Sequence, residues 1–271
     1  NESLGLNNGF TLSGSHRTRL ESVNDSVRSS TSINDDLLTF LTLLNAEYKN
    51  GGFGAQVEVI DARQALADTD SIFGADSINT LDILQANLNY SFGDSNNSSV
   101  KVGRIAGDWG SRRLLARHRY GNNINAFDGI EFRQRGSAGK ELRLLASRPV
   151  RKLPSDRASL LDNERNSDES SNAQKFYGAY LALPELSEYF STDFFFYSLQ
   201  EADTQDINTL NRHINSYGVR LLKAPVAGQF NFELESIIQT GQRRATTASA
   251  DRSTLDHKAF FQYAMLGYSF D

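Results

Sequence analysis

Arginines are concentrated in one part of this chain, between Arg104 and Arg135 (RIAGDWGSRRLLARHRYGNNINAFDGIEFRQR). Residues 101–152 hold 13 Lys and Arg against 4 Asp and Glu, a local charge of +9 in a chain whose net charge is −5. Arginine stays charged in proteins, and its planar guanidinium pairs with carboxylates in a bidentate geometry. The concentration therefore predicts a place where an anion sits or passes.

Composition limits the classes of protein that could present these arginines. The chain has 271 residues, 39% of them hydrophobic, and a mean hydropathy of −0.46. It has no run of 18 apolar residues, which excludes a transmembrane helix but not a membrane barrel, whose strands need only every second residue apolar. Without cysteine, disulfides and thiolate metal sites are excluded. No charged and apolar leader follows Asn1, so we expect any secretion signal to lie upstream or to have been removed.

Apolar and polar residues alternate with a period of two in about 12 segments, which predicts strands with one apolar and one polar face. The first segment, Phe10–Glu21, puts Arg17, Arg19 and Glu21 on its polar face. The predicted apolar sets in other segments are Leu38, Phe40, Leu44 and Tyr48; Ala55, Val57 and Val59; Leu84, Ala86, Leu88, Tyr90 and Phe92; Ile130 and Phe132; Leu142, Leu144 and Ala146; Phe230, Phe232 and Leu234.

Short and long polar connections alternate between these segments. The short ones lie near 49–53, 93–99, 136–140, 184–191 and 224–229, and the long ones near 22–35, 64–79, 106–126, 149–172, 202–212 and 242–256. Aromatic residues gather at the short-turn end, namely Tyr48, Phe53, Tyr90, Phe92, Tyr189, Phe190, Phe230 and Phe270. This rhythm and an aromatic girdle are typical of outer-membrane barrels. A soluble β-sandwich also alternates, but the predicted strands of roughly 9–13 residues exceed its usual 5–6.

We therefore predict an all-β fold, an antiparallel transmembrane β-barrel formed by residues 1–271 as a single domain. If Ile130 and Phe132 face lipid, Arg133 and Arg135 face the lumen, and the same parity turns Arg143, Arg17 and Arg19 inward. Asp128, Glu131 and Glu21 would orient some arginines and keep an anion from binding too tightly to leave. In the alternative interpretation, the arginines pair with lumen carboxylates and merely fill the barrel.

Two positions stay open at this point. Val100 and Val102 would place Arg104 on the lipid face unless a bulge intervenes. Residues 106–126 form a long loop that either folds inward and constricts the lumen or lies exposed on the surface.

The arginine-rich block resembles the signature of the alginate export porin family. Its elements are Gly103-Arg104, Gly110-Ser111-Arg112-Arg113-Leu114, Arg117 and Arg119, the asparagines Asn122, Asn123 and Asn125, and Phe127-Asp128-Gly129. Residues 13–22 (SGSHRTRLES) and 43–63 are similar to the first three strands of that family. The resemblance covers essentially the whole chain, and the block at 103–129 is its specific part.

The resemblance implies a monomeric barrel in the bacterial outer membrane, surrounded by lipid, which exports an anionic polysaccharide such as an alginate-like polyuronate. It implies an arginine-lined lumen. The residues that we expect to line it are Arg17, Arg19, Arg104, Arg112, Arg113, Arg117, Arg119, Arg133, Arg135 and Arg143 with Glu21, Asp128 and Glu131. Such barrels have 18 strands, whereas about 12 are predicted here. We therefore interpret the chain as an N-terminal fragment or a shortened member, with closure of the barrel left open.

Other signals are weak, and we expect no catalytic, metal or cofactor site and no nucleic-acid partner. Gly93-Asp94-Ser95 lies in a short turn without a positioned histidine. His16, His118, His213 and His257 are dispersed, and residues 151–172 are more readily a solvated loop than a Ca²⁺ site. The alternative functions are a general or small-anion porin and, less favoured, a soluble β-rich carbohydrate-binding module. A barrel-embedded hydrolase would need a triad that we cannot assemble.

Overall fold

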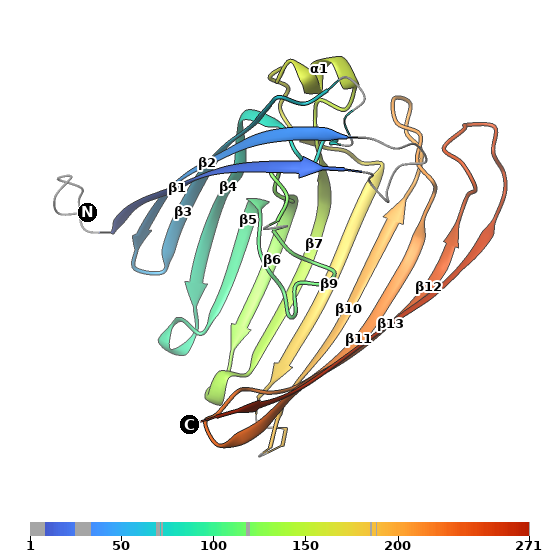
Figure 1. The fold of residues 1–271 in the computed structure, drawn as a ribbon. Coiled ribbons are helices and arrows are strands. Elements are labelled where there is room, and N and C mark those ends of the chain that lie inside the picture. The colour runs from blue at the N-terminus through green and yellow to red at the C-terminus, as the bar shows by residue number, and fades with distance from the viewer. Residues whose placement is uncertain are drawn as a thin grey trace. The chain divides into compact units, whose positions relative to one another are not determined.

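The computed structural model describes residues 9–24, 34–68, 71, 73–117, 120–184, 186–187 and 189–270. Thirteen β-strands dominate these residues (Figure 1). They are β1 (Phe10–Val23), β2 (Asp35–Asn50), β3 (Phe53–Ala65), β4 (Asn79–Phe92), β5 (Ser98–Ile105), β6 (Phe127–Arg135), β7 (Glu141–Arg151), β8 (Glu169–Ser170), β9 (Gln174–Leu183), β10 (Ser191–Glu201), β11 (His213–Lys223), β12 (Gln229–Arg243) and β13 (Leu255–Ser269). The helical elements are η2 (Asp94–Asn96), η3 (Ser137–Gly139) and α1 (Arg157–Leu161).

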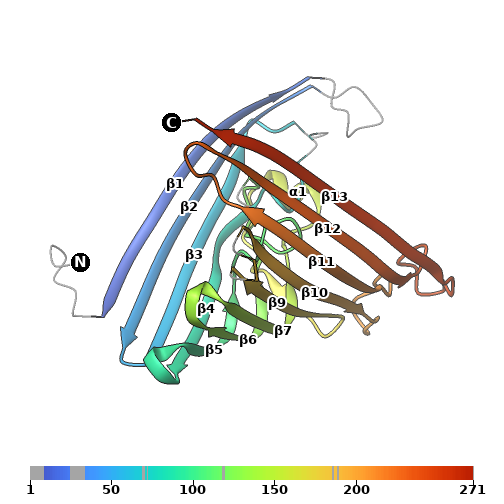
Figure 2. The same ribbon diagram turned by 90° about the horizontal axis from the view of Figure 1, so that it is seen from below.

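Apart from β8, the strands follow one another in a single sheet in the order of the sequence (Figures 1 and 2). The two-residue β8 pairs with β7 off this path. The registers from β1 to β4 and from β7 to β13 are antiparallel. The expected all-β antiparallel fold is confirmed, and β8 is the strand beyond the 12 predicted. No helix among the described residues is long and apolar enough to cross a membrane.

The predicted alternation of short and long connections is confirmed by the strand bounds. Short connections join β2 to β3, β4 to β5, β6 to β7, β9 to β10 and β11 to β12. Long ones join β1 to β2, β3 to β4, β5 to β6, β7 to β9 (with β8 inside it), β10 to β11 and β12 to β13. Gly51 and Gly228 have φ of 58° and 73° in two of the short turns. Glycine adopts this left-handed conformation without the steric penalty of a Cβ, which allows strands of this length to reverse within a few residues.

The chain divides into two compact units. Unit 1 comprises residues 1–90, 102–128 and 149–170, and unit 2 comprises residues 91–101, 129–148 and 171–271. Strands β1 to β3 therefore lie wholly in unit 1, and β9 to β13 lie wholly in unit 2.

Unit 1 contains β1 to β3 and most of β4. One face of its sheet packs against the connection between β5 and β6. Leu41, Ile60 and Ala62 on that face form a core with Ile124 and Ala126 from the connection between β5 and β6.

The expected orientation of Leu84 in β4 was wrong. The register between β3 and β4 shifts between Glu58 and Val59, so Leu84 is buried in this core at 3% exposure while Ile83 is 48% exposed. A bulge reverses the alternation of a strand, which is why period-two reasoning misplaced this residue.

A second core of unit 1 lies under the long connections. Leu160 in α1 packs with Leu37, Phe73 and Ile78. Asp156 caps the helix by accepting a hydrogen bond from the Ser159 amide at 3.0 Å. Part of the segment 151–172 therefore folds onto the sheet, whereas the sequence indicated a solvated loop.

Unit 2 contains most of β7 and all of β9 to β13, and its sheet separates side chains into an apolar and a polar face. On the apolar face, cross-strand neighbours include Leu144, Ala179, Phe196, Tyr217 and Ile238. The next residue of each strand belongs to the polar face, where charged side chains and tyrosines gather. Because side chains of a strand alternate between faces, the register alone assigns each residue to one of them.

Candidate functional site

The polar face of unit 2 carries a row of arginine–carboxylate pairs, which we call the charge ladder. It consists of Glu131, Arg133, Arg135, Glu141, Arg143, Asp193, Arg220, Glu233 and Glu235, that is, four arginines and five carboxylates. They come from β6, β7, β10, β11 and β12. The ladder exists because each strand contributes charged residues at alternate positions and the registers bring these positions side by side.

The first part of the ladder joins β6 to β7. The Arg143 guanidinium lies 3.1 Å from the Glu131 carboxylate, and the two side chains are 12% and 9% exposed. Arg133 forms a close ion pair with Glu141, and Arg135 reaches the same carboxylate at 3.8 Å with 58% of its side chain exposed. The predicted residues Arg133, Arg143 and Glu131 are thus brought together, and each arginine has a carboxylate partner.

The second part of the ladder was not predicted as a site. Arg220 of β11 lies 3.3 Å from Asp193 of β10 and 2.9 Å from Glu233 of β12. The Tyr180 hydroxyl also hydrogen-bonds the Asp193 carboxylate. Period-two reading of β11 would have placed Arg220 opposite Val219 and Leu221, but only the register shows that two carboxylates flank it.

In unit 1, the connection 106–126 is attached to the polar side chains of β3 and β4. Arg117 forms a bidentate pair with Glu58, with N–O distances of 2.8 and 3.0 Å, and the Glu58 side chain is only 8% exposed. The Ala106 amide donates to the Gln85 side chain at 2.9 Å. Trp109 is buried at 4% exposure. The connection is therefore packed onto the sheet of unit 1 rather than spread over its outside.

The predicted arginines of β1 also bind this connection. Arg17 donates to the Gly121 carbonyl at 2.7 Å, and Arg19 donates to the Tyr120 carbonyl. Arg19 additionally pairs with Glu21 at 2.9 Å. Arg17 and Arg19 thus hold the connection through its backbone carbonyls.

The paired asparagines of the connection are structural. Asn122 is 1% exposed and its amide donates to the carbonyls of Phe40 and Ser77 at 3.0 and 2.8 Å. Asn123 is fully buried and donates to the carbonyls of Ala75 and Ile78 at 3.0 and 2.9 Å. Buried carbonyls need donors, and asparagine supplies two from one amide.

Arg112 and Arg113 line a pocket of about 640 Å³ within the same connection. Its other lining residues are Asp108, Ser111, Leu114, Ala116, Tyr120 and Asn125. Arg112 has φ of 67° and an exposed side chain. Arg119, also a predicted residue, lies outside the described residues.

Arg104 at the end of β5 is fixed by several acceptors. Its guanidinium forms a bidentate pair with Asp128, at 2.8 and 3.1 Å, and donates to the carbonyls of Ile83 and Asp168 at 3.2 and 3.0 Å. Arg104 and Asp128 form a half-buried pair, with side-chain exposures of 18% and 24%. Arg104 therefore fixes the ends of strands and a connection to one another.

Asp168 beside Arg104 is a buried carboxylate outside the long strands. Burial raises its pKa to about 6, and the nearby Asp82 adds to the effect, while the Leu153 amide, Arg104 and Lys152 oppose it. Burial also lowers the pKa of Lys152. Asp168 accepts hydrogen bonds from the Leu153 amide and the Asn79 side chain at 2.7 and 2.8 Å.

The stability of wild-type protein should fall relative to Asp168→Asn as the pH rises from 4 to 7. A carboxylate whose folded pKa is raised contributes stability below its unfolded pKa of about 4 and loses it as the pH passes its folded pKa near 6. We expect a relative loss of about 2–3 kcal/mol in the free energy of unfolding, measured by denaturant titration at each pH. If the free energy of unfolding of the two proteins depends on pH in the same way, the claim that burial raises the pKa of Asp168 is contradicted.

No group of three or more His, Cys, Asp or Glu side chains capable of holding a metal ion occurs in the described part of the chain. His16 bonds to the hydroxyls of Thr42 and Thr18, and Asp94-Ser95 lies in the short turn η2. The charge ladder of unit 2 therefore presents guanidinium groups that are paired with carboxylates. In unit 1, arginines hold the connection 106–126. Such groups can exchange carboxylate partners but do not activate a nucleophile.

A family model described as "Alginate export" matches residues 9–271, which is nearly the whole chain. No curated protein matches this chain.

Proposed function

Because the chain belongs to the alginate export family, an outer-membrane porin family, we propose that it is a passive outer-membrane channel whose arginines conduct an acidic polysaccharide. The family establishes export of a polysaccharide through a channel, and it is a transport family rather than an enzyme family. We further propose that the chain lies in the outer membrane and acts as a monomer, with residues 1–271 forming a single domain, and that it has no nucleic-acid partner.

The charge ladder of unit 2 carries the proposal. Arg133, Arg143 and Arg220 already bind carboxylates of the protein at hydrogen-bonding distance. A uronate carboxylate offers the same acceptor geometry, so it can replace a protein carboxylate without leaving the guanidinium unpaired. Competition from Glu131, Glu141 and Asp193 keeps each contact weak. A conducting pore must hold its substrate weakly and at several places.

Unit 1 would contribute in a different way. Arg17, Arg19 and Arg117 bind the connection 106–126, and Arg112 and Arg113 line its pocket. We propose that this connection narrows the lumen and that its pocket offers arginines to the passing polymer. The lumen-lining set is then the predicted one, namely Arg17, Arg19, Arg104, Arg112, Arg113, Arg117, Arg119, Arg133, Arg135 and Arg143 with Glu21, Asp128 and Glu131, extended by Arg220, Asp193 and Glu233.

Reversal potential and conductance in planar bilayers, under a salt gradient and with oligouronates, test this proposal. We expect anion selectivity and block by oligouronates, and we expect Arg133→Ala with Arg135→Ala to weaken the block about tenfold, the factor that corresponds to ~1.4 kcal/mol. Arg148→Ala is the matched control because Arg148 lies on β7 at the opposite parity to Arg143 and bonds Asn172. Conductance that is indifferent to oligouronates would contradict a polyuronate channel.

A general porin is the second candidate, and the composition of the ladder favours it. Five carboxylates against four arginines give this face no excess of positive charge, although residues 101–152 carry +9. A balanced lumen would select weakly between small ions. Weak selectivity without oligouronate block is therefore the result that would identify it.

A further inference from the structure

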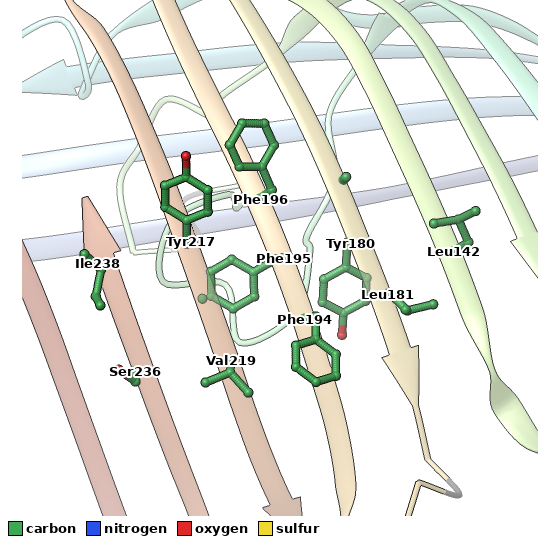
Figure 3. Close-up of a pocket in the computed structure, with 12 residues that line it drawn as sticks. Leu142, Tyr180, Leu181, Phe194, Phe195, Phe196, Tyr217, Val219, Ser236 and Ile238 are labelled. Carbon is green, nitrogen blue, oxygen red and sulfur yellow. The ribbon is translucent and has the colours of Figure 1, made fainter. Parts of the chain in front are cut away.

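The apolar face of unit 2 contains a hollow of about 490 Å³ that the channel function does not use (Figure 3). Its walls are side chains of the apolar parity, namely Leu142, Ala179, Leu181, Phe194, Phe196, Tyr217, Val219, Ser236 and Ile238. Tyr180, Phe195 and Gly218, which alternate with them along β9, β10 and β11, complete the lining. We call this hollow the groove.

The groove arises from the sizes of cross-strand neighbours. Leu181, Phe194, Val219 and Ser236 form one row across β9 to β12, and Ala179, Phe196, Tyr217 and Ile238 form the next. The small side chains of Ala179 and Ser236 leave space beside large ones. Gly218 has no side chain, and the Phe195 ring occupies the position that its Cβ would take. The Phe195 ring therefore fills the space beside Gly218.

A cation and aromatic rings lie on the same face at the short-turn end. Lys223 ends β11 at the parity of Val219 and Tyr217, and it neighbours Phe232 of β12. The rings of Phe190 and Phe232 are 6.0 Å apart, and those of Phe230 and Tyr268 are 5.0 Å apart. Aromatic belts of this kind mark the membrane–water interface, and lysine there attracts anionic headgroups.

We infer that the groove and Lys223 form a binding site for one anionic phospholipid, whose phosphate contacts Lys223 while an acyl chain fills the groove. The inference rests on the proposed membrane location. The span from Lys223 to Tyr217 is about 20 Å along a strand and about 14 Å of depth at a tilt of about 45°. That depth is close to one leaflet of a hydrocarbon core about 30 Å thick.

Tryptophan reporters and brominated lipids test the site in reconstituted protein. Tyr217→Trp places a reporter in the groove, and Leu88→Trp places one on the apolar face of unit 1, where Leu88 is 56% exposed. Buried Trp109 gives the same background in both variants. Each is mixed into phosphatidylcholine bilayers that contain equal mole fractions of brominated phosphatidylglycerol or brominated phosphatidylcholine, and quenching is compared.

We expect the Tyr217→Trp reporter to prefer phosphatidylglycerol about fivefold, the factor for one lysine at an anionic headgroup, while the Leu88→Trp reporter shows no preference. Lys223→Gln should remove the preference. Ser236→Phe should reduce quenching of the groove reporter by both lipids, because the added ring fills the groove. Equal quenching of both reporters by both lipids would overturn the site while leaving the channel intact. Absence of quenching at both reporters would overturn the membrane location itself.

Discussion

Arg117→Ala should destabilise the protein by about 2–4 kcal/mol and raise its single-channel conductance. The substitution leaves Glu58, whose side chain is 8% exposed, without the guanidinium that binds both of its oxygens. It also removes one of the side-chain attachments of the connection 106–126, the pair that joins Arg117 to Glu58 of β3. Denaturant titration and bilayer recordings measure the two effects on the same preparation.

Two further variants separate the loss of a buried charge partner from the release of the connection. Arg63→Ala on β3 breaks an exposed 3.0 Å pair with Asp61 and should cost less than about 1 kcal/mol with unchanged conductance. Arg117→Ala with Glu58→Gln removes the buried charge, so most of the stability should return. Conductance should stay raised in this double variant because the Arg117–Glu58 attachment is still missing. A conductance equal to wild type in both Arg117 variants would refute the proposal that the connection narrows the lumen.

Arg220→Met should cost about 3 kcal/mol of unfolding free energy and shift the channel towards cations. Asp193 and Glu233 lie 3.3 and 2.9 Å from this guanidinium, and Glu235, at 3% exposure, faces the same residue across the register. Removal of the arginine takes away the guanidinium that Asp193 and Glu233 share. The free energy of unfolding and the reversal potential report the two consequences.

Arg135→Met is the matched control for Arg220→Met. Arg135 belongs to the same charge ladder, but it is 58% exposed and lies 3.8 Å from Glu141. We expect a stability change below about 1 kcal/mol, since screened and exposed pairs contribute little. Addition of Asp193→Asn and Glu233→Gln to Arg220→Met should restore stability and abolish cation selectivity. If Arg220→Met and Arg135→Met lower the free energy of unfolding equally, the contribution of the ladder's arginines to stability does not depend on their burial.

Local pattern determined most of the fold. Alternation at Phe10–Glu21 and at Ile130 to Arg135, together with the spacing of turns, predicted the strands and the order of short and long connections. Side chains of any strand alternate with period two, so one sequence suffices to read the faces. The pattern failed at Leu84 because a bulge depends on the neighbouring strand, which local alternation does not report.

The sequence by itself determined that arginines lie on polar strand faces in a family of polysaccharide exporters. Only the tertiary structure decided which carboxylate each arginine meets. Arg117 meets Glu58 across 59 positions and Arg220 meets Asp193 across 27. Strand register and the packing of a long connection determine such partners. Both depend on the free energy of the whole unit rather than on neighbouring residues in the sequence. Charge counts along the chain contain no information on these distances. The charge of +9 over 101–152 therefore did not reveal that Arg133 and Arg143 are paired with carboxylates.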